Sequence, residues 1–359
     1  RGDKMLIVDR YILRTVMTSV LLVVAVLLAL SGLITFVGQL DNVGKGDFGI
    51  SDALSFVLLV LPQRAFEFMP VAALLGALFG LSRLAAHSEL IVLRAAGVTP
   101  LRLATSVVAV GILIASLNAA LGEFISPPLE RYAEQQRALA KYTDLNLSAE
   151  QSIWLMHEGL IINASPRSES NWGGGVYVFD FDDERNLTGV GRADSASLGP
   201  DQRWTLRSIV ETRLDSGQLR SLTEESRKLS AGISPELIRF SEVYPDNMTG
   251  RDLHGYINYL RDNDLDASSY EIAFWGRVAG PVAIVLMTLL AMPFAFRFQR
   301  DSGTSVTMAI GVIIGLIYFL ASRTLANSGQ VFDIDPMLIA WAPSLALGLI
   351  TMVGLFRLR

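Results

Sequence analysis

The stretch TVMTSVLLVVAVLLALSGLITFV, residues 15–37, carries no charged side chain and is long enough to cross a bilayer as a helix. It is too long to be the apolar part of a cleaved signal peptide, and no small-residue cleavage site followed by a polar chain accompanies it. The whole chain is 51% hydrophobic and 18% charged, with a mean hydropathy of +0.41. This composition is typical of a protein with several membrane spans rather than of a soluble domain.

Five further apolar segments have the length of a membrane span. They cover residues 62–81, 103–127, 272–296, 305–325 and 337–356. A long polar stretch separates the first three spans from the last three. The sequence therefore predicts a membrane α-helical fold of six transmembrane helices with an inserted domain, divided at 1–127, 128–268 and 269–359.

Basic residues near the span ends predict how the chain is oriented. With six spans, the following side chains all fall on one side of the membrane: Arg10, Arg14, Arg83, Arg94, Arg102, Arg297, Arg300, Arg357 and Arg359. Because cytoplasmic loops are enriched in arginine and lysine, we expect this side, with both termini, to be cytoplasmic. The middle domain is then expected outside the cytoplasm.

The middle domain begins with a helix and continues as short strands. Pro127 and Pro128 are expected to end the third span sharply, and residues 129–142 read as a helix leaving the membrane. The runs GLIINAS, GVYVFDF, LTGVGRADSA and RWTLRSIVETRL follow, separated by turn-forming residues. Several such runs at short spacing predict an all-β, jelly-roll-like domain. We expect the sequence NWGGG, residues 171–175, to be a turn, and a polar helix to follow the sheet from residue 248.

The last of these runs has a period of two. Its apolar residues alternate with polar ones, namely Trp204, Leu206 and Val210 with Thr205, Arg207 and Glu211. Such alternation predicts a strand with one buried face, so Val210 is expected inside and Glu211 outside.

A short amphipathic helix is predicted between the second and third spans, in the sequence LSRLAAHSELIVLRAAGVTP of residues 81–100. The helix covers about residues 86–97, since Gly97 and Pro100 are typical stop signals. A helix of this kind in the cytoplasm can dock in a groove of a partner protein. Its candidate contact residues are His87, Glu89, Leu90, Leu93 and Arg94.

Several function classes are disfavoured by the sequence. A formal net charge of −5 argues against nucleic-acid binding, and the absence of cysteine excludes thiol chemistry and disulfides. The three histidines are far apart, so we expect no histidine metal site. Residues 38–46, GQLDNVGKG, have the wrong spacing for a phosphate-binding loop and follow a span rather than a strand. No paired carboxylates, histidine cluster or activated serine suggests an enzyme.

Glycine pairs four residues apart predict close helix packing. Gly76 and Gly80 lie in the second span, and Gly311 and Gly315 lie in the fifth. Small residues at this spacing allow helix backbones to approach one another in lipid.

Five charged residues are candidates for contact with a lipid. Arg64 and Glu67 lie three residues apart in an apolar stretch, where they can pair on one helix face and line the outer mouth of a cavity or lie at the interface. Lys45 lies beyond the first span, and Arg131 and Arg137 lie beyond the third. These three could hold an anionic lipid head group, or they could belong to a solvated helix face.

Four features together resemble one transporter family. They are DRYI from Asp9, PVAALLGALFGL from Pro70, HSELIVLRAAG from His87, and the order of three spans, a domain and three spans. The chain resembles the lipopolysaccharide-export permease family of the LptF/LptG type, and the G-type subunit matches better. The resemblance covers essentially the whole chain from Met5.

The resemblance implies a permease subunit of an ABC exporter in the inner membrane of Gram-negative bacteria. It implies an F-type sister permease, two copies of a cytoplasmic ATPase and a single-span accessory subunit with a periplasmic jelly roll as partners. Lipopolysaccharide would leave the outer leaflet of the inner membrane for a periplasmic bridge of jelly-roll domains, as outer membrane biogenesis requires. ATP would be bound by the partner ATPase, so the chain itself would hold no cofactor and no metal.

The resemblance also assigns roles to individual residues. Glu89 matches the acid of the coupling helix that contacts the ATPase, and Arg137 matches a basic position that helps hold lipid phosphates. Asp41 and Asn42 stand where a G-type chain can carry lysines, so Lys45 or Arg131 is expected to substitute. Two alternatives stay open: a permease for another lipid or a lipoprotein, and a membrane scaffold that transports nothing and binds no ATPase at Glu89.

Overall fold

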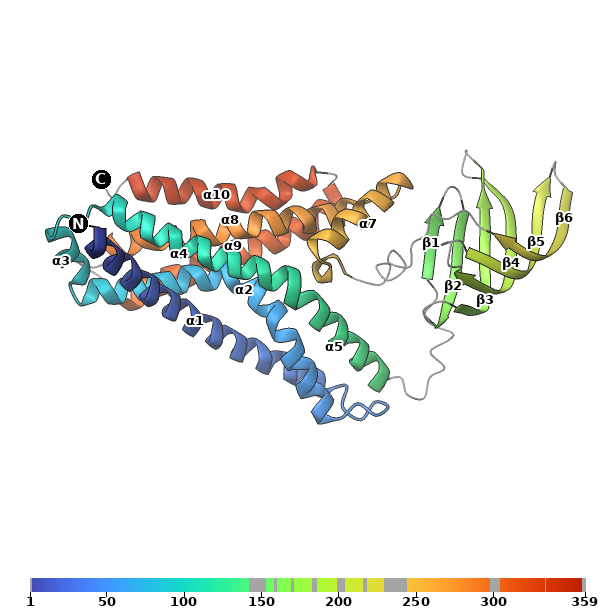
Figure 1. Ribbon diagram of the computed structural model, residues 1–359, viewed down its shortest axis with the longest axis horizontal. Helices are drawn as coiled ribbons and strands as arrows, with labels where there is room; N and C mark the ends of the chain where they lie inside the picture. The colour runs from blue at the N-terminus through green and yellow to red at the C-terminus, as the bar shows by residue number, and fades with distance from the viewer. Residues whose placement is uncertain are drawn as a thin grey trace. The chain divides into compact units, whose positions relative to one another are not determined.

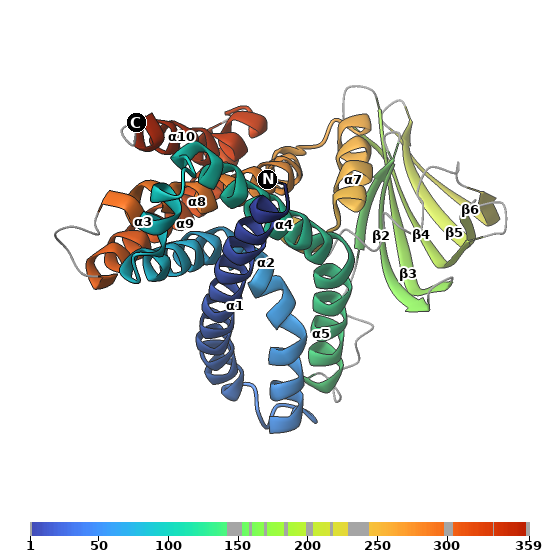
Figure 2. The same cartoon turned by 60° about the vertical axis from the view of Figure 1, so that its left-hand side comes forward.

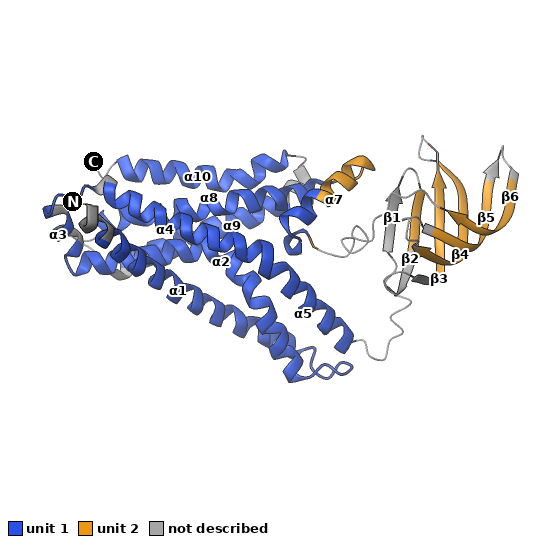
Figure 3. Ribbon diagram, in the orientation of Figure 1, with its two compact units in different colours: residues 1–141, 245–254, 267–359 blue, residues 142–244, 255–266 orange. Residues whose placement is uncertain are grey.

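The computed structural model describes residues 2–141, 153–157, 160–168, 171–182, 186–198, 204–215, 218–228, 244–297, 304–332 and 334–356. The chain divides into two compact units (Figure 3). One unit contains residues 1–141, 245–254 and 267–359, and the other contains residues 142–244 and 255–266.

The first unit is helical (Figure 1). Its elements are α1 (Gly2–Leu40), α2 (Ile50–Ala86), α3 (Glu89–Ala95), α4 (Pro100–Ala120), the π-helix η1 (Leu121–Ile125), α5 (Ser126–Lys141), the 3₁₀-helix η2 (Pro245–Asn247), α8 (Ser268–Arg297), α9 (Thr304–Phe332) and α10 (Pro336–Phe356). Helix α7 (Gly250–Asp262) begins in this unit and ends in the other. Six helical stretches of the described chain are long and apolar enough to cross a membrane, which confirms the predicted number of spans.

Two predicted helix boundaries are wrong. Helix α2 begins at Ile50, so Pro62 lies inside it rather than near its start. The third span does not end at Pro127 and Pro128, because the chain passes from α4 through η1 into α5 (Figure 2). These prolines lie in the first turn of α5, where a helix tolerates a residue that lacks an N–H group.

Helix α2 is central to the packing of this unit, and its glycines set the distance to α1. A Cβ atom on Gly76 would lie 2.4 Å from Cα of Val20, and one on Gly80 would lie 3.3 Å from Cα of Val16. The glycine spacing therefore marks a close helix contact, as predicted. Leu74 and Leu78 of α2 are completely buried in the main hydrophobic core.

The second unit contains a six-stranded antiparallel sheet. Its strands are β1 (Ile153–His157), β2 (Leu160–Ser168), β3 (Asn171–Phe181), β4 (Leu187–Leu198), β5 (Trp204–Asp215) and β6 (Gln218–Lys228). They pair in sequential order from β1 to β6. The predicted strands and the β insertion are confirmed, whereas the jelly-roll arrangement of that insertion stays a prediction.

The predicted turn at residues 171–175 is wrong. Strand β3 begins at Asn171, and Trp172 lies opposite Ala196 of β4. The register shifts between Gly173 and Val176, where Gly175 has a φ of +103°. The glycines thus accommodate a bulge inside a strand rather than the reversal between two strands.

The predicted alternation in β5 is also wrong beyond Arg207. Leu206 and Ile209 are both buried, although they lie three residues apart. Ser208 between them has a φ of +52°, which breaks the period of two. As a result Val210 is 49% exposed and Glu211 only 3% exposed, the reverse of the expectation.

The buried Glu211 is held by charged neighbours within the sheet. Its carboxylate oxygens lie 2.5 Å from Nε of Arg213 and 2.8 Å from Nη1 of Arg227, which also lies 3.7 Å from Asp180. Burial raises the pKa of Asp180, and a hydrogen bond with Glu211 raises it further. Burial also raises the pKa of Glu211, but the hydrogen bonds with Arg213 and Asp180 and the nearby arginine charges lower it by more. Asp180 therefore holds a proton more readily than Glu211.

Replacing Arg227 with methionine is expected to destabilise the sheet in a pH-dependent way. The change leaves Glu211 and Asp180 with less compensating charge, at a cost of about 3 kcal/mol near neutral pH. Without Arg227 the folded-state pKa of both carboxyls rises, so the stability lost in the variant is largest where both carboxyls are ionised and becomes smaller as the pH falls. Thermal unfolding of the full-length protein should show a deficit that shrinks on mild acidification. A deficit that is independent of pH would contradict this account.

Candidate functional site

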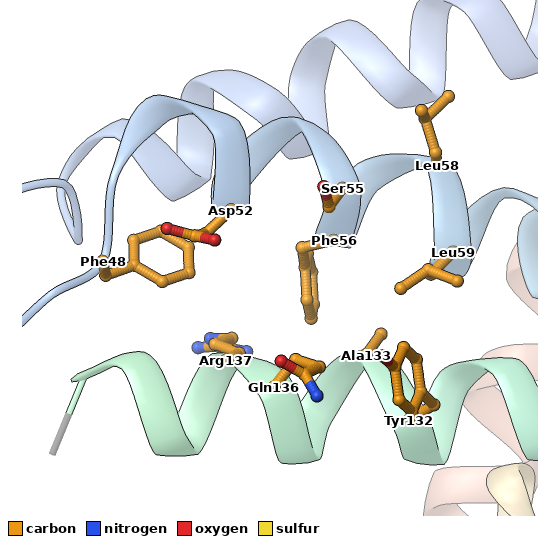
Figure 4. Close-up of a pocket in the computed structure, with 10 residues that line it drawn as sticks. All are labelled: Phe48, Asp52, Ser55, Phe56, Leu58, Leu59, Tyr132, Ala133, Gln136 and Arg137. Atoms are coloured by element: carbon orange, nitrogen blue, oxygen red, sulfur yellow. The ribbon is translucent and has the colours of Figure 1, made fainter. Parts of the chain in front are cut away.

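A groove lies between the beginning of α2 and the middle of α5 (Figure 4). It encloses about 410 Å³. Its lining residues are mostly apolar or aromatic, with a few polar groups: Phe48, Asp52, Ser55, Phe56, Leu58, Leu59, Tyr132, Ala133, Gln136 and Arg137. The sequence places these residues one to two turns apart on each helix, so that each helix contributes one wall.

Arg137 points from α5 across the groove (Figure 4). The centre of its guanidinium lies 5.2 Å from the centroid of the Phe56 ring, a cation–π arrangement. Its Nη1 atom also lies 3.2 Å from Glu134, whose side chain is 51% exposed. Because an exposed ion pair of this kind contributes little, an anion can replace Glu134 at small cost.

Two lysines lie near Arg137. The loop that carries Lys45 contacts the end of α5, since the N–H of Asp47 donates to the carbonyl of Ala140 at 2.9 Å. Gly46 allows this contact: its φ is +57°, and a Cβ there would lie 2.6 Å from the same carbonyl oxygen. Lys141, the last residue of α5, interacts electrostatically with Arg137 and Lys45.

The structure thus brings together two of the predicted lipid-contact residues, Lys45 and Arg137, and adds Lys141. We call these three residues the basic cluster. Lys141 follows Arg137 by four residues, and this helical spacing was the signal available in the sequence. Cations beside an apolar groove suit a ligand with an anionic head and a hydrocarbon tail.

The other three predicted lipid-contact residues do not line this groove, and each lies in an ion pair. Arg64 pairs with Glu67 at 3.0 Å on α2, as their spacing predicts. Arg131 lies 3.5 Å from Asp252 at the beginning of α7.

Arg277 and Arg323 are functional candidates that sequence reasoning missed. Arg323 of α9 lies 3.3 Å from Glu67 and 3.0 Å from Asp246 of η2. Arg277 of α8 donates to the carbonyls of Gly122 at 2.8 Å and of Asp246 at 3.1 Å. The chain segment around Asp246 is therefore fixed to α2, α8 and α9. The available signal was that each arginine interrupts an apolar span, but nothing in the sequence pointed to Asp246.

A short helix, α3, is present where it was predicted, but it covers Glu89–Ala95 rather than residues 86–97. Its cytoplasmic location stays a prediction. Gly97, with a φ of +88°, lies just beyond its end. Glu89 accepts a hydrogen bond from the phenol of Tyr11 at 2.7 Å. His87 is exposed and donates from Nδ1 to the carbonyl of Arg83 at 2.9 Å.

The remaining predicted contact residues of α3 are only partly described. Leu93 is half-buried and packs against the hydrophobic core. The side chains of Leu90 and Arg94 lie outside the described residues. Across the described part of the chain, no group of three or more histidine, aspartate and glutamate side chains is placed to hold a metal ion.

The family model and the similar proteins that match this chain all belong to one family of permeases. The family model described as lipopolysaccharide export system permease LptF/LptG matches residues 10–358. The lipopolysaccharide export system permease protein LptG of Escherichia coli K12 is 30% identical over 353 residues, which cover 98% of each chain. LptG of Haemophilus influenzae is 28% identical over 94% of each chain. LptF of E. coli K12 is 22% identical, over 95% of this chain and 92% of its own length.

Proposed function

Because the chain belongs to the LptF/LptG family of lipopolysaccharide export permeases, we propose that it is the G-type permease of an ABC exporter in the bacterial inner membrane. In this proposal it extracts lipopolysaccharide from the outer leaflet and passes it to a periplasmic bridge of jelly-roll domains. The stronger similarity to LptG than to LptF supports the assignment to the G type.

The proposed complex contains several partners. An F-type sister permease completes the translocation pathway, and a single-span accessory subunit with its own jelly roll joins it. Two copies of a cytoplasmic ATPase bind the coupling helices and hydrolyse ATP, so the permease itself is not an enzyme and needs no cofactor. The termini and α3 then lie in the cytoplasm and the sheet lies in the periplasm, in agreement with the distribution of arginine along the sequence.

The observation that carries this proposal is the basic cluster beside the groove between α2 and α5. Lipopolysaccharide combines phosphate groups with several acyl chains. Exposing one CH₂ group of an acyl chain to water costs about 0.8 kcal/mol, so an extraction pathway must offer apolar surface throughout. Leu58, Leu59 and Tyr132, which line the groove and are at least partly exposed, offer such a surface, and Arg137 with its neighbouring lysines can hold phosphate.

The coupling helix supplies the mechanical input. ATP binding and hydrolysis on the partner would move α3, and with it the ends of α2 and α4 that flank α3 in the chain. Because α2 also forms one wall of the groove, its displacement would alter the space available to the lipid. Arg64, Glu67 and Arg131 act in this scheme as charged residues on the outer side of the pathway.

Removing the positively charged side chain that lines the groove, Arg137, tests this function. Replacing Arg137 with alanine is expected to weaken lipopolysaccharide binding to the purified complex by about 10-fold, since a charge-assisted hydrogen bond contributes about 1.5 kcal/mol or more. Adding Lys45→Ala and Lys141→Ala should weaken it further. Bound lipopolysaccharide is measured by equilibrium binding of a labelled molecule to the complex.

Glu134→Gln is the matched control, because it removes the carboxylate that competes for Arg137 and leaves every cation in place. The affinity of the Glu134→Gln complex for lipopolysaccharide should equal or exceed that of the wild-type complex. Unchanged affinity in the triple variant would refute a role for the cluster. A wild-type complex that prefers another lipid or a lipoprotein would refute the proposed substrate.

A further inference from the structure

Helix α1 contacts both the coupling helix α3 and the helix α4 that follows it. The hydroxyl of Tyr11 donates to Oε2 of Glu89, the first residue of α3, at 2.7 Å. Two residues earlier, the carboxylate of Asp9 accepts hydrogen bonds from Arg102 and Ser106 of α4. The DRYI sequence therefore fixes the beginning of α1 beside the start of α3 and beside the helix that follows it.

The coupling helix depends on such contacts for its position. A helix of seven residues is too short to be stable by itself. Ser88, which precedes it, has a φ of +58°, and Gly97 beyond its end has a φ of +88°, so the chain changes direction on both sides. In the described part of the chain, Tyr11 is the side chain that hydrogen-bonds to the carboxylate of Glu89.

The hydrogen bond leaves half of the carboxylate available. Tyr11 binds Oε2, so Oε1 can still accept a bond from an arginine or lysine of a partner. A carboxylate that is already held in one rotamer loses less conformational entropy when a partner binds. Tyr11 is itself 46% exposed, so its hydroxyl is not needed to satisfy a buried polar group.

We propose that Tyr11 is a positioning residue, which holds the carboxylate of Glu89 in the orientation that the ATPase recognises. This inference rests on the proposed function, because it requires Glu89 to contact the ATPase. The inference gives the first spanning helix a role in coupling, in addition to its packing against α2 and its hydrogen bonds to α4.

The test uses the complete complex of this chain, the sister permease and the ATPase. The dissociation constant of the ATPase from the permease pair is measured for the wild type, Tyr11→Phe, Glu89→Asp, the double variant and Glu89→Ala. We expect Tyr11→Phe to weaken ATPase binding by about 10-fold, as expected for the loss of one hydrogen bond to a charged group. Glu89→Asp keeps the charge but withdraws the carboxylate from the phenol, so the effect of Tyr11→Phe should largely disappear in that background.

A purely structural role for Tyr11 would give the same loss in both backgrounds, and this result would overturn the inference. The inference would also be overturned if the Tyr11→Phe variant bound the ATPase with the same affinity as the wild type. Tyr244→Phe is the control, since it removes a hydroxyl from a tyrosine that is 78% exposed and far from α3 in sequence. If Glu89→Ala itself leaves ATPase binding unchanged, the proposed coupling contact fails. If Glu89→Ala weakens binding and Tyr11→Phe does not, only the role of Tyr11 fails.

Discussion

Replacing Glu89 with arginine is expected to reduce lipopolysaccharide-stimulated ATP hydrolysis of the assembled complex by about 100-fold or more, since opposing like charges across an interface cost several kcal/mol. Glu89 is the acidic residue at the start of α3, and its carboxylate retains one oxygen for a cation on the ATPase. Charge reversal would place the new guanidinium against that cation. The measurement is ATP turnover with and without lipopolysaccharide, together with the amount of ATPase that co-purifies.

Glu89→Gln provides the graded control for the charge reversal. It keeps the size of the side chain and a hydrogen-bond acceptor but loses the negative charge, so its effect should lie between the wild type and the arginine variant. The assignment of α3 as the coupling helix would be wrong if the arginine variant retained its ATPase and full turnover. A scaffold without a transport function would instead show no ATPase that co-purifies with the wild type, and the substitution would change nothing.

Replacing Gly76 with leucine is expected to prevent the helical unit from assembling. Even the Cβ atom would lie 2.4 Å from Cα and 2.7 Å from the backbone N of Val20, so two backbones would have to separate. Overpacking of a well-packed core commonly costs about 1–3 kcal/mol, and a clash between backbones exceeds the upper part of that range. We expect the leucine variant not to accumulate as a monodisperse protein in detergent, and the alanine variant to unfold at a lower temperature.

Gly276 of α8 is the matched control for this prediction. It also lies within an apolar helix, but a Cβ there would meet no atom within 4 Å. Gly276→Ala should therefore behave like the wild type, because alanine is the better helix former and nothing obstructs it. Equal thermal stability of the Gly76→Ala and Gly276→Ala variants would show that the contact between α1 and α2 does not depend on the small residue.

Local patterns in the sequence predicted most of the fold. Runs of apolar residues, one of them residues 15–37, predicted the six spans because a bilayer requires length and low charge, and both are visible in a short window. The prediction that the third span ends at Pro127 and Pro128 was wrong because proline disrupts the interior of a helix but fits its first turn. The sequence did not show that a new helix begins at Ser126.

Errors in the sheet have the same origin in backbone geometry. The alternation of buried and exposed residues in β5 is broken by the positive φ of Ser208. A serine in the sequence does not predict a positive φ. Burial of Glu211 follows from that break and from Arg213 and Arg227, which lie on the same strand and the next one. A register change of this kind depends on pairing across strands, so it was not available from one run of residues.

The candidate site was predicted in part. The positions of Lys45 and Arg137 beyond their spans indicated a basic outer region. The structure brings the two residues together, because the loop that carries Lys45 contacts the end of α5, the helix that carries Arg137. Pairing of Arg323 with Glu67 and Asp246 joins residues that are far apart in the chain. Such contacts depend on helix packing, for which single-sequence periodicity provides no register.

The most direct test of the central claim is ATP-driven removal of lipopolysaccharide from a membrane. The wild-type chain is reconstituted into vesicles with its sister permease, the accessory subunit and the ATPase, and transfer of labelled lipopolysaccharide to a soluble jelly-roll acceptor is measured. Our account predicts transfer that requires ATP and that is strongly reduced by Arg137→Ala and by Glu89→Arg. An intact complex that hydrolyses ATP without transferring lipopolysaccharide, or that transfers it equally well without ATP, would contradict the account.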